Sequence, residues 1–345
     1  MVSEAPPFWW SRADWRAWSL WPISSLYAAV AGKRMVSARR EKFDVPVLCV
    51  GNLTVGGSGK TPIAIALARQ ARAMGLTPGI LSRGHGGTVS GEAHLVDIVN
   101  DVARHVGDEP LLLARAATVA VTADRAAGAR ALIAQDCNFL IMDDGFQSAR
   151  IHMDYALIVV DARRGIGNGH VIPGGPLRAR MVDQMRHVDA VLKVGSGSAA
   201  DIVVRQAAKA GRAFFEASVR PTAPDGISGQ RCLAFAGIGE PEKFFDTVRA
   251  VGGDVVVARS FGDHHFYSGF DAQELIDTAE AQGLQLVTTA KDAVRLDHAE
   301  GALSTLRQRV KVIEIEAEFQ VAGAPRAIIE HTMHAWRRRR IEDRK

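Results

Sequence analysis

Short apolar runs alternate with longer helical segments along most of this chain. Residues 45–50, 139–142 and 155–160 are runs of branched and other apolar residues, typical of strands buried on both faces of a sheet. The first run is followed by a glycine-rich loop and then by an Ala/Ile/Leu-rich segment, which predicts a helix to about Met74. This alternation, continued to about residue 190, predicts a parallel sheet with right-handed crossovers and helices on both faces.

A second alternation of the same kind begins after residues 220–229, a turn-rich stretch interpreted as a linker or a hairpin. Further strands are expected at residues 232–236, 254–258, 284–288 and 310–315. This pattern predicts a second, smaller α/β unit. A cleft between two such units is the expected position of an active site.

The first 40 residues have a pattern of their own, because five of the six tryptophans of the chain lie within the first 21 residues. Apolar residues then recur at helical spacing to Val30, and a basic stretch starts at Lys33. The pattern predicts an apolar helix pair, broken near Pro22, beside a cluster of cations. Such a segment is suited to the interface of a bilayer, with its indole rings at headgroup depth.

Other interpretations of this segment remain open. The apolar run at residues 17–31 is shorter than the roughly 20 residues that a transmembrane helix needs. A cleaved signal peptide fits poorly, because Glu4 and Asp14 precede a late apolar run. Packing of the helix on the protein core is as compatible with these residues as membrane contact is.

Composition and charge narrow the class of protein without identifying a partner. The chain has 345 residues, 47% of them apolar and 23% charged, which predicts about two globular domains and excludes an intrinsically disordered protein. A net charge of +4 gives no reason to expect a nucleic-acid partner. Three scattered cysteines cannot form a disulfide framework, so we expect a reducing compartment.

Residues 51–62, G-N-L-T-V-G-G-S-G-K-T-P, lie between the first predicted strand and its helix. In a Walker A loop, backbone N–H groups wrap a phosphate, a lysine reaches the outer phosphates and a hydroxyl holds Mg²⁺. The leading glycine of that pattern is replaced here, and no N-K-x-D guanine motif is present, which favours ATP. The residues predicted to bind ATP are Thr54, Val55, Gly56, Gly57, Ser58, Gly59, Lys60 and Thr61.

Two carboxylates, Asp143 and Asp144, come directly after the predicted strand at residues 139–142. Ligands of open α/β sheets bind at the carboxyl ends of strands, and one or two carboxylates beside the phosphates suffice to hold Mg²⁺. Together with Thr61, this pair predicts the metal site. The next strand leads into a glycine-rich loop, residues 161–178, whose arginines are suited either to clamp phosphates or to face solvent.

Taken together, seven motifs resemble the tetraacyldisaccharide 4′-kinase (lipid A 4′-kinase) family across nearly the whole chain. They are G-N-x-T-V-G-G-S-G-K-T-P at 51–62, S-R-G at 82–84, G-D-E-P at 107–110, D-D-G-F-Q at 143–147, G-N-G with P-G-G-P-L-R at 167–178, D-H at 263–264 and K-D-A-V at 291–294. The resemblance implies transfer of the ATP γ-phosphate to the 4′-hydroxyl of a tetraacyldisaccharide 1-phosphate, giving lipid IVA. It also implies a monomer at the cytoplasmic face of the bacterial inner membrane, with no nucleic-acid partner.

The resemblance also assigns roles by position. Lys60, Asp108 and His264 match the family's catalytic residues, and Glu109 is expected to add a carboxylate on the metal side. The residues expected to contact the substrate are Arg83, Gln147, Asn168 and Arg178. Two positions depart from the family pattern: Ser148 stands where a histidine is common, and Ala290 where a glutamate is common.

These expectations define an α/β fold, with a P-loop NTPase-like parallel sheet, a second smaller α/β domain and an N-terminal membrane-contacting helix. The expected divisions are a membrane-associating segment at residues 1–40, a P-loop kinase domain at 41–218 and a smaller domain at 219–345. The basic stretch at 336–345 is expected to be a helix end or a tail, either exposed to solvent or attracted to anionic lipid. Two other functions remain open, a membrane-associated nucleotide switch and a kinase of a soluble sugar.

Overall fold

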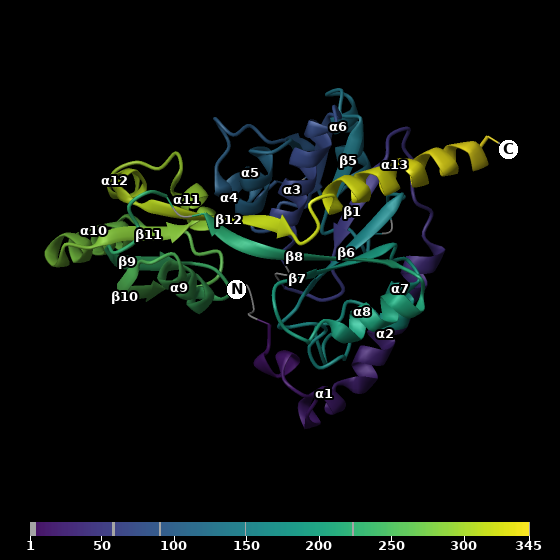
Figure 1. The fold of residues 1–345 in the computed structure, drawn as a ribbon, viewed down its shortest axis with the longest axis horizontal. Helices are drawn as coiled ribbons and strands as arrows, with labels where there is room; N and C mark the ends of the chain where they lie inside the picture. The colour runs from purple at the N-terminus through teal and green to yellow at the C-terminus, as the bar shows by residue number, and fades with distance from the viewer. Residues whose placement is uncertain (1–4, 57–58, 90, 149, 223, 345) are drawn as a thin grey trace.

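The structure, a computed structural model, describes residues 5–56, 59–89, 91–148, 150–222 and 224–344. Within these residues, one 12-stranded sheet runs through the molecule in the order β10-β9-β11-β12-β8-β7-β6-β1-β5-β2-β4-β3 (Figure 1). Neighbouring strands are parallel except β12 with β8 and β3 with β4. The predicted α/β fold with a mainly parallel sheet is therefore confirmed.

The strands from β1 to β8 form the larger part of the sheet. They are β1 (Val47–Gly51), β2 (Pro78–Ser82), β3 (His94–Leu95), β4 (Thr118–Val121), β5 (Phe139–Asp143), β6 (Tyr155–Asp161), β7 (Ala190–Val194) and β8 (Ala213–Thr222). β1, β2 and β5 are buried along their whole length, which explains their mainly apolar sequences. Each of these three strands ends beside a predicted functional motif.

Helices cover both faces of this part of the sheet, and each face has its own apolar core. The helices of one face are α3 (Lys60–Ala73), α4 (Ala103–Val106), α5 (Asp108–Ala114) and α13 (Ala324–Glu342). Those of the other face are α2 (Trp21–Ser37), α6 (Arg125–Ile133), α7 (Met181–Met185) and α8 (Asp201–Lys209). The two faces are therefore closed by segments far apart in sequence.

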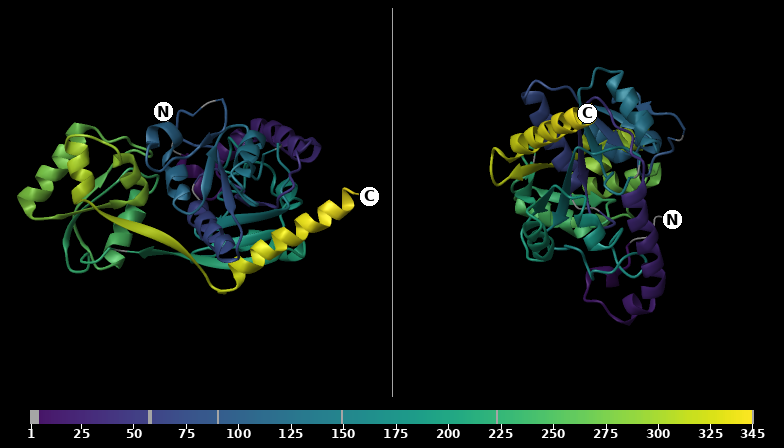
Figure 2. Two further views of the ribbon diagram at one scale, coloured as in Figure 1. Left: turned by 90° about the horizontal axis from the view of Figure 1, so that it is seen from above. Right: turned by 90° about the vertical axis from the view of Figure 1, so that its right-hand side faces the viewer.

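The second unit has two smaller cores around the remaining strands. Its strands are β9 (Arg231–Ala236), β10 (Asp254–Ser260), β11 (Gln285–Thr289) and β12 (Lys311–Phe319), and its helices are α9 (Pro241–Ala250), α10 (Gly269–Gln282), α11 (Ala290–Leu296) and α12 (Ala302–Arg309). Figure 2 shows this unit at one end of the molecule, joined to the rest through β8 and β12.

The segment predicted as a linker or hairpin is arranged differently at its start. Residues 220–222 continue β8, which pairs with β12 and not with β9, so the predicted hairpin is wrong. The strand partner lies about ninety residues further along the chain, as in the pair Pro221 and Ile315, and no local turn signal reports such a pairing. The boundary expected at residues 218/219 lies inside β8.

The N-terminal segment forms a short 3₁₀ turn, η1 (Pro7–Trp10), followed by α1 (Trp15–Ser19) and α2. The break between the two helices is at Leu20, and Pro22 lies in the first turn of α2, where its missing N–H costs nothing. Among the described residues, none of the helices combines the length and the apolar character required to cross a bilayer.

Candidate active site

The glycine loop (residues 51–62) connects β1 to α3 at the carboxyl edge of the sheet. Gly59 caps α3 with φ of +77°, a left-handed conformation that glycine adopts without strain, and Lys60 is the first residue of the helix. The backbone N–H of Val55 donates to the carbonyl of Pro176 at 2.9 Å. Gly57 and Ser58, both predicted to bind ATP, lie outside the described residues.

Asp144 lies beside this loop, because β5 pairs with β1 and brings its own end level with the end of β1. Both carboxylate oxygens of Asp144 accept hydrogen bonds from Arg178, each at 2.9 Å, and Oδ1 lies 3.8 Å from the Nζ of Lys60. Burial raises the pKa of Asp144, but the charges of Lys60 and Arg178 outweigh it and lower the pKa to about 2. This carboxylate is therefore charged at neutral pH.

Asp143 has the opposite electrostatic setting. Its Oδ1 is buried and has no hydrogen-bond partner among the described residues. Burial, followed by the negative charges of Glu109 and Asp144, outweighs the influence of Lys60 and raises the pKa of Asp143 to about 7. A buried carboxylate oxygen without a donor, close to two further carboxylates, fits the hard oxygen ligation that Mg²⁺ prefers.

Asp108 and His264 come from different units and meet at the cleft. Asp108 opens α5 directly after Gly107, and its Oδ2 lies 3.3 Å from the Nδ1 of His264 and also pairs with Arg295. Burial raises the pKa of Asp108, but His264, Lys291 and Arg295 together lower it well below its ordinary value. The hydrogen bond to Asp108 in turn raises the pKa of His264. The cleft beside this pair is lined by residues that include His85 and Phe266.

A second contact between the units is the ion pair of Glu109 and Lys291, whose atoms are 2.6 Å apart. Lys291 and Arg295 lie on α11 four residues apart, so both project from one side of the helix toward α5. Asp292 fixes Arg295 through a contact of 2.8 Å. Arg295 was not predicted to have a role, although its i, i+4 spacing from Lys291 was a usable signal.

Arg125 is a further buried residue that the sequence did not single out. Its guanidinium donates to the main-chain carbonyls of Leu81, Asp143 and Asp144 at 3.0–3.2 Å. These bonds tie the ends of β2 and β5 together. No motif would have revealed this role, because Arg125 lies at the start of α6 and acts only on backbone oxygens.

The four residues predicted to contact substrate have different surroundings. Arg178 and Gln147 lie at the acidic pair, joined by a hydrogen bond of 3.2 Å. Arg83 is exposed directly after β2. The amide of Asn168 faces the protein, where it donates to the carbonyl of Gly174 at 2.9 Å and accepts from the N–H of His170 at 3.0 Å.

Comparison with known proteins identifies the family. A family model described as tetraacyldisaccharide-1-P 4′-kinase matches residues 16–333. The chain belongs to this family. Proteins named tetraacyldisaccharide 4′-kinase from Mesorhizobium japonicum and Agrobacterium fabrum are 61% and 53% identical to this chain, over 99% of it and over 99% and 98% of their own lengths. This agrees with the resemblance that the motifs predicted.

The fold of this 4′-kinase also matches a solved structure. LpxK from Aquifex aeolicus, determined in complex with ATP, superimposes with a TM-score of 0.72 over 92% of this chain and 99% of that one, at 24% sequence identity. This likeness confirms the fold. Family membership confirms a kinase of lipid A biosynthesis, so the nucleotide switch and the soluble-sugar kinase lose their support.

Proposed function

We propose that this chain transfers the γ-phosphate of ATP to the 4′-hydroxyl of tetraacyldisaccharide 1-phosphate, with the glycine loop as the nucleotide site. The observation that carries the proposal is the placement of Lys60, Asp144 and Asp143 at one edge of the sheet beside the glycine loop, with an Asp143 oxygen that has no hydrogen-bond partner among the described residues. Phosphoryl transfer passes through a loose transition state, so alignment and positive charge supply most of the catalysis.

Lys60 is the group proposed to neutralise charge on the outer phosphates, and its salt bridge to Asp144 holds it at this edge of the sheet. Thr61, Asp143, Asp144 and Glu109 would hold Mg²⁺. A bound Mg²⁺ ion supplies further stabilisation of charge on the phosphates. Arg178 is held by Asp144 at the same edge and is suited to meet a phosphate oxygen when nucleotide enters.

Asp108 is proposed to accept the proton of the 4′-hydroxyl, with His264 and Arg295 orienting its carboxylate. Its lowered pKa keeps it ionised, which suits a transition state in which the proton leaves late. Lys291 neutralises Glu109 nearby and joins the two units at the cleft. Arg83, exposed directly after β2, is a candidate contact for a phosphate of the acceptor.

The direct test is incubation with γ-labelled ATP and tetraacyldisaccharide 1-phosphate, followed by separation of the lipid. Lys60→Ala is expected to reduce label in the lipid by at least about 10²-fold, because it removes a charge that stabilises the transition state. Lys209→Ala, at the exposed end of α8, is the matched control and is expected to behave as wild type. Label that stays out of the lipid with wild-type protein would refute the proposal.

A further inference from the structure

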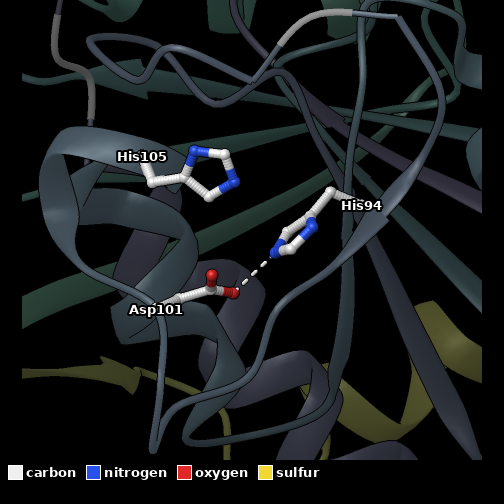
Figure 3. A group of neighbouring side chains, drawn as sticks. All are labelled: His94, Asp101 and His105. Atoms are coloured by element: carbon white, nitrogen blue, oxygen red, sulfur yellow. Dashed lines mark hydrogen bonds and ion pairs between the residues drawn. The ribbon is translucent and has the colours of Figure 1, made fainter.

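Away from the glycine loop, the structure gathers His94, Asp101 and His105 into one cluster (Figure 3). His94 lies on β3, Asp101 ends the loop that follows it, and His105 lies on α4. One candidate ligand atom from each residue lies within 4.8 Å of the other two. The rings of His94 and His105 meet edge to face, with centroids 5.0 Å apart.

Part of this cluster is already held in place by hydrogen bonds. The Oδ2 of Asp101 lies 2.7 Å from the Nε2 of His94 and accepts the N–H of Asp97 at 2.9 Å. Asp101 is buried, so its carboxylate has few alternative orientations. The Nδ1 of His105 lies 3.5 Å from the hydroxyl of Thr88, and its Nε2 has no hydrogen-bond partner among the described residues. The contacts from Asp97 and Thr88 come from outside the cluster, as do the contacts that orient metal ligands in known sites, whereas the bond between Asp101 and His94 joins two proposed ligands.

We propose that His94, Asp101 and His105 bind one transition-metal ion of the zinc type, with water as a fourth ligand. Two imidazoles and one carboxylate are a ligand set that Zn²⁺ accepts and that Mg²⁺, which prefers oxygen, does not. Ligand atoms around a tetrahedral Zn²⁺ ion lie roughly 3.4 Å apart, given bonds of about 2.1 Å. His105, exposed on a short helix, would close on this pair, and the Nε2 of His94 and the Oδ2 of Asp101, which lie 2.7 Å apart, would separate to admit the ion.

The position of the cluster gives the ion a structural role. It would fasten α4 to β3, and α4 ends at Val106, so that only its C-cap residue, Gly107, separates it from Asp108. The carbonyl of His105 also accepts the N–H groups of Thr88 and Val89, at 2.9 and 3.1 Å. Fixing His105 therefore fixes both the loop after β2 and the start of α5, the two segments that border the cleft of Asp108.

The test uses the tag-free full-length protein, freed of metal by a chelator and kept in excess Mg²⁺ to occupy oxygen sites. Zn²⁺ is titrated against a chromophoric chelator, and Co²⁺ is added to a second sample to record its visible absorption. We expect one bound equivalent and the intense bands of tetrahedral Co²⁺. His94→Ala and His105→Ala are each expected to weaken Zn²⁺ binding by at least about tenfold.

Two controls separate this site from others. His334→Ala changes an exposed histidine on α13 and is expected to bind Zn²⁺ as wild type does. Asp143→Asn is expected to bind one equivalent of Zn²⁺ as wild type does, because Asp143 lies at the glycine loop and not in the cluster. Zn²⁺ should raise the Tm of wild type but not that of the His94→Ala/His105→Ala double variant.

Equal Zn²⁺ affinity in wild type and the double variant would overturn the proposal, as would the absence of tetrahedral Co²⁺ bands in wild type. If loss of the His94 hydrogen bond prevents folding, His105→Ala alone decides the question. His105 is exposed, so its replacement should leave the metal-free Tm unchanged.

Discussion

Asp144 and His264 share an unusual backbone conformation, with φ of +49° and +57°. Among the described residues, only four that are not glycine have a positive φ, and two of these four lie at the candidate active site. Such conformations cost free energy for residues with a Cβ and persist where the surroundings enforce them. Here the ion pair with Arg178 holds Asp144 in place, and the contact with Asp108 holds His264 in place.

Asp143→Asn tests the electrostatics of the acidic pair. In the folded protein the pKa of Asp143 is raised to about 7 from an ordinary 3.8, so folded protein keeps a proton that unfolded protein has released. The carboxyl therefore destabilises the fold progressively as pH rises from about 4 to about 7. The amide variant should gain about 1 kcal/mol or more in free energy of unfolding at pH 8, because each unit of pKa displacement corresponds to about 1.4 kcal/mol.

The same substitution should weaken the binding of Mg²⁺ with nucleotide, since an amide carries no charge for the ion. Denaturant unfolding at about pH 5 and pH 8 and titration with Mg²⁺ and ATP measure the two effects. At pH 5 the stability of the two proteins should be closer. A variant that is less stable than wild type at pH 8 would contradict the unpartnered setting of this carboxylate.

His264→Asn tests the pairing of His264 with Asp108, and asparagine tolerates the positive φ at this position. The hydrogen bond to Asp108 raises the pKa of His264 above 6.5, with Asp263 adding to the effect. The stabilising contribution of the pair is then complete below about pH 6.5 and is lost as pH rises through the raised pKa. Wild type should therefore exceed the variant in stability most clearly near pH 6.

The catalytic effect of this variant should appear in turnover. A residue that orients the base contributes to kcat, so kcat should fall by about 10²–10⁴-fold with a nearly unchanged KM for ATP. Steady-state kinetics and unfolding curves at about pH 6 and pH 9 supply both readouts. A difference in stability that is the same at both pH values would mean that the pair is not charged.

At the scale of elements, the sequence predicted the local structure around the site well. The expected bounds of β1, β5 and β6 and the expected end of α3 lie within two residues of the observed ones, because apolar runs and the glycine loop mark these elements directly. α5 starts within the G-D-E-P motif, and the two carboxylates of that motif belong to its first turn. The contacts of Arg295 and Arg125 depend on tertiary packing, which periodicity does not encode.

The arginine loop (residues 161–178) is an element whose role the structure clarifies. The side chain of Asn168 makes hydrogen bonds to other residues of this loop, and its backbone N–H donates to the carbonyl of Trp9 at 2.7 Å. The far end of the loop braces the glycine loop, where the N–H of Arg178 donates to the carbonyl of Leu53 at 3.0 Å. The loop thus links the N-terminal segment to the nucleotide site.

Asn168→Ala should therefore act on stability and on the nucleotide site together. Loss of its partly buried side-chain hydrogen bonds is expected to cost about 1–3 kcal/mol in unfolding free energy. The KM for ATP should rise because the brace on the glycine loop is loosened. Thermal unfolding and kinetics with each substrate measure this. A raised KM for the lipid alone, with unchanged Tm, would instead indicate the direct substrate contact expected from the sequence.

At the scale of the whole molecule, the N-terminal helices present an apolar surface on one side. Trp15, Trp18, Trp21 and Leu26 are 76%, 60%, 55% and 69% exposed. Figure 1 shows α1 projecting beyond the sheet. The opposite side of the same helices is fixed by buried contacts, including Ala17, Ala28 and Met35. Core packing and an open apolar face are thus both present, on different sides of one segment.

The basic C-terminal stretch lies elsewhere. It forms the end of α13, one of the two expected arrangements, on the face of the sheet opposite α2. Arg339 is fixed to buried Asp154 at 2.7 Å, and Arg340 stacks on Trp336 at 5.2 Å. Two of the four arginines at residues 337–340 are thus engaged in the protein, while Arg337 and Arg338 are exposed. Residues 341–345 carry two acidic and two basic side chains, so we expect their removal to leave vesicle binding unchanged in a sedimentation assay.

The apolar face of α1 and α2 is the surface proposed to meet the membrane, and its side chains can be changed without disturbing the core. Replacing Trp18, Trp21 and Leu26 by serine removes apolar area worth roughly 1.5–3 kcal/mol for each fully buried side chain. Binding to vesicles of anionic phospholipid should fall by at least about tenfold, because 1.4 kcal/mol changes an equilibrium constant tenfold. Activity on substrate in vesicles should fall with it, while activity on detergent-dispersed substrate should be kept.

Phe270→Ser, at a residue 78% exposed on α10, is the matched control for loss of a surface apolar group. Vesicle binding that survives the triple replacement would remove the membrane role from this segment and leave it only its packing on the core.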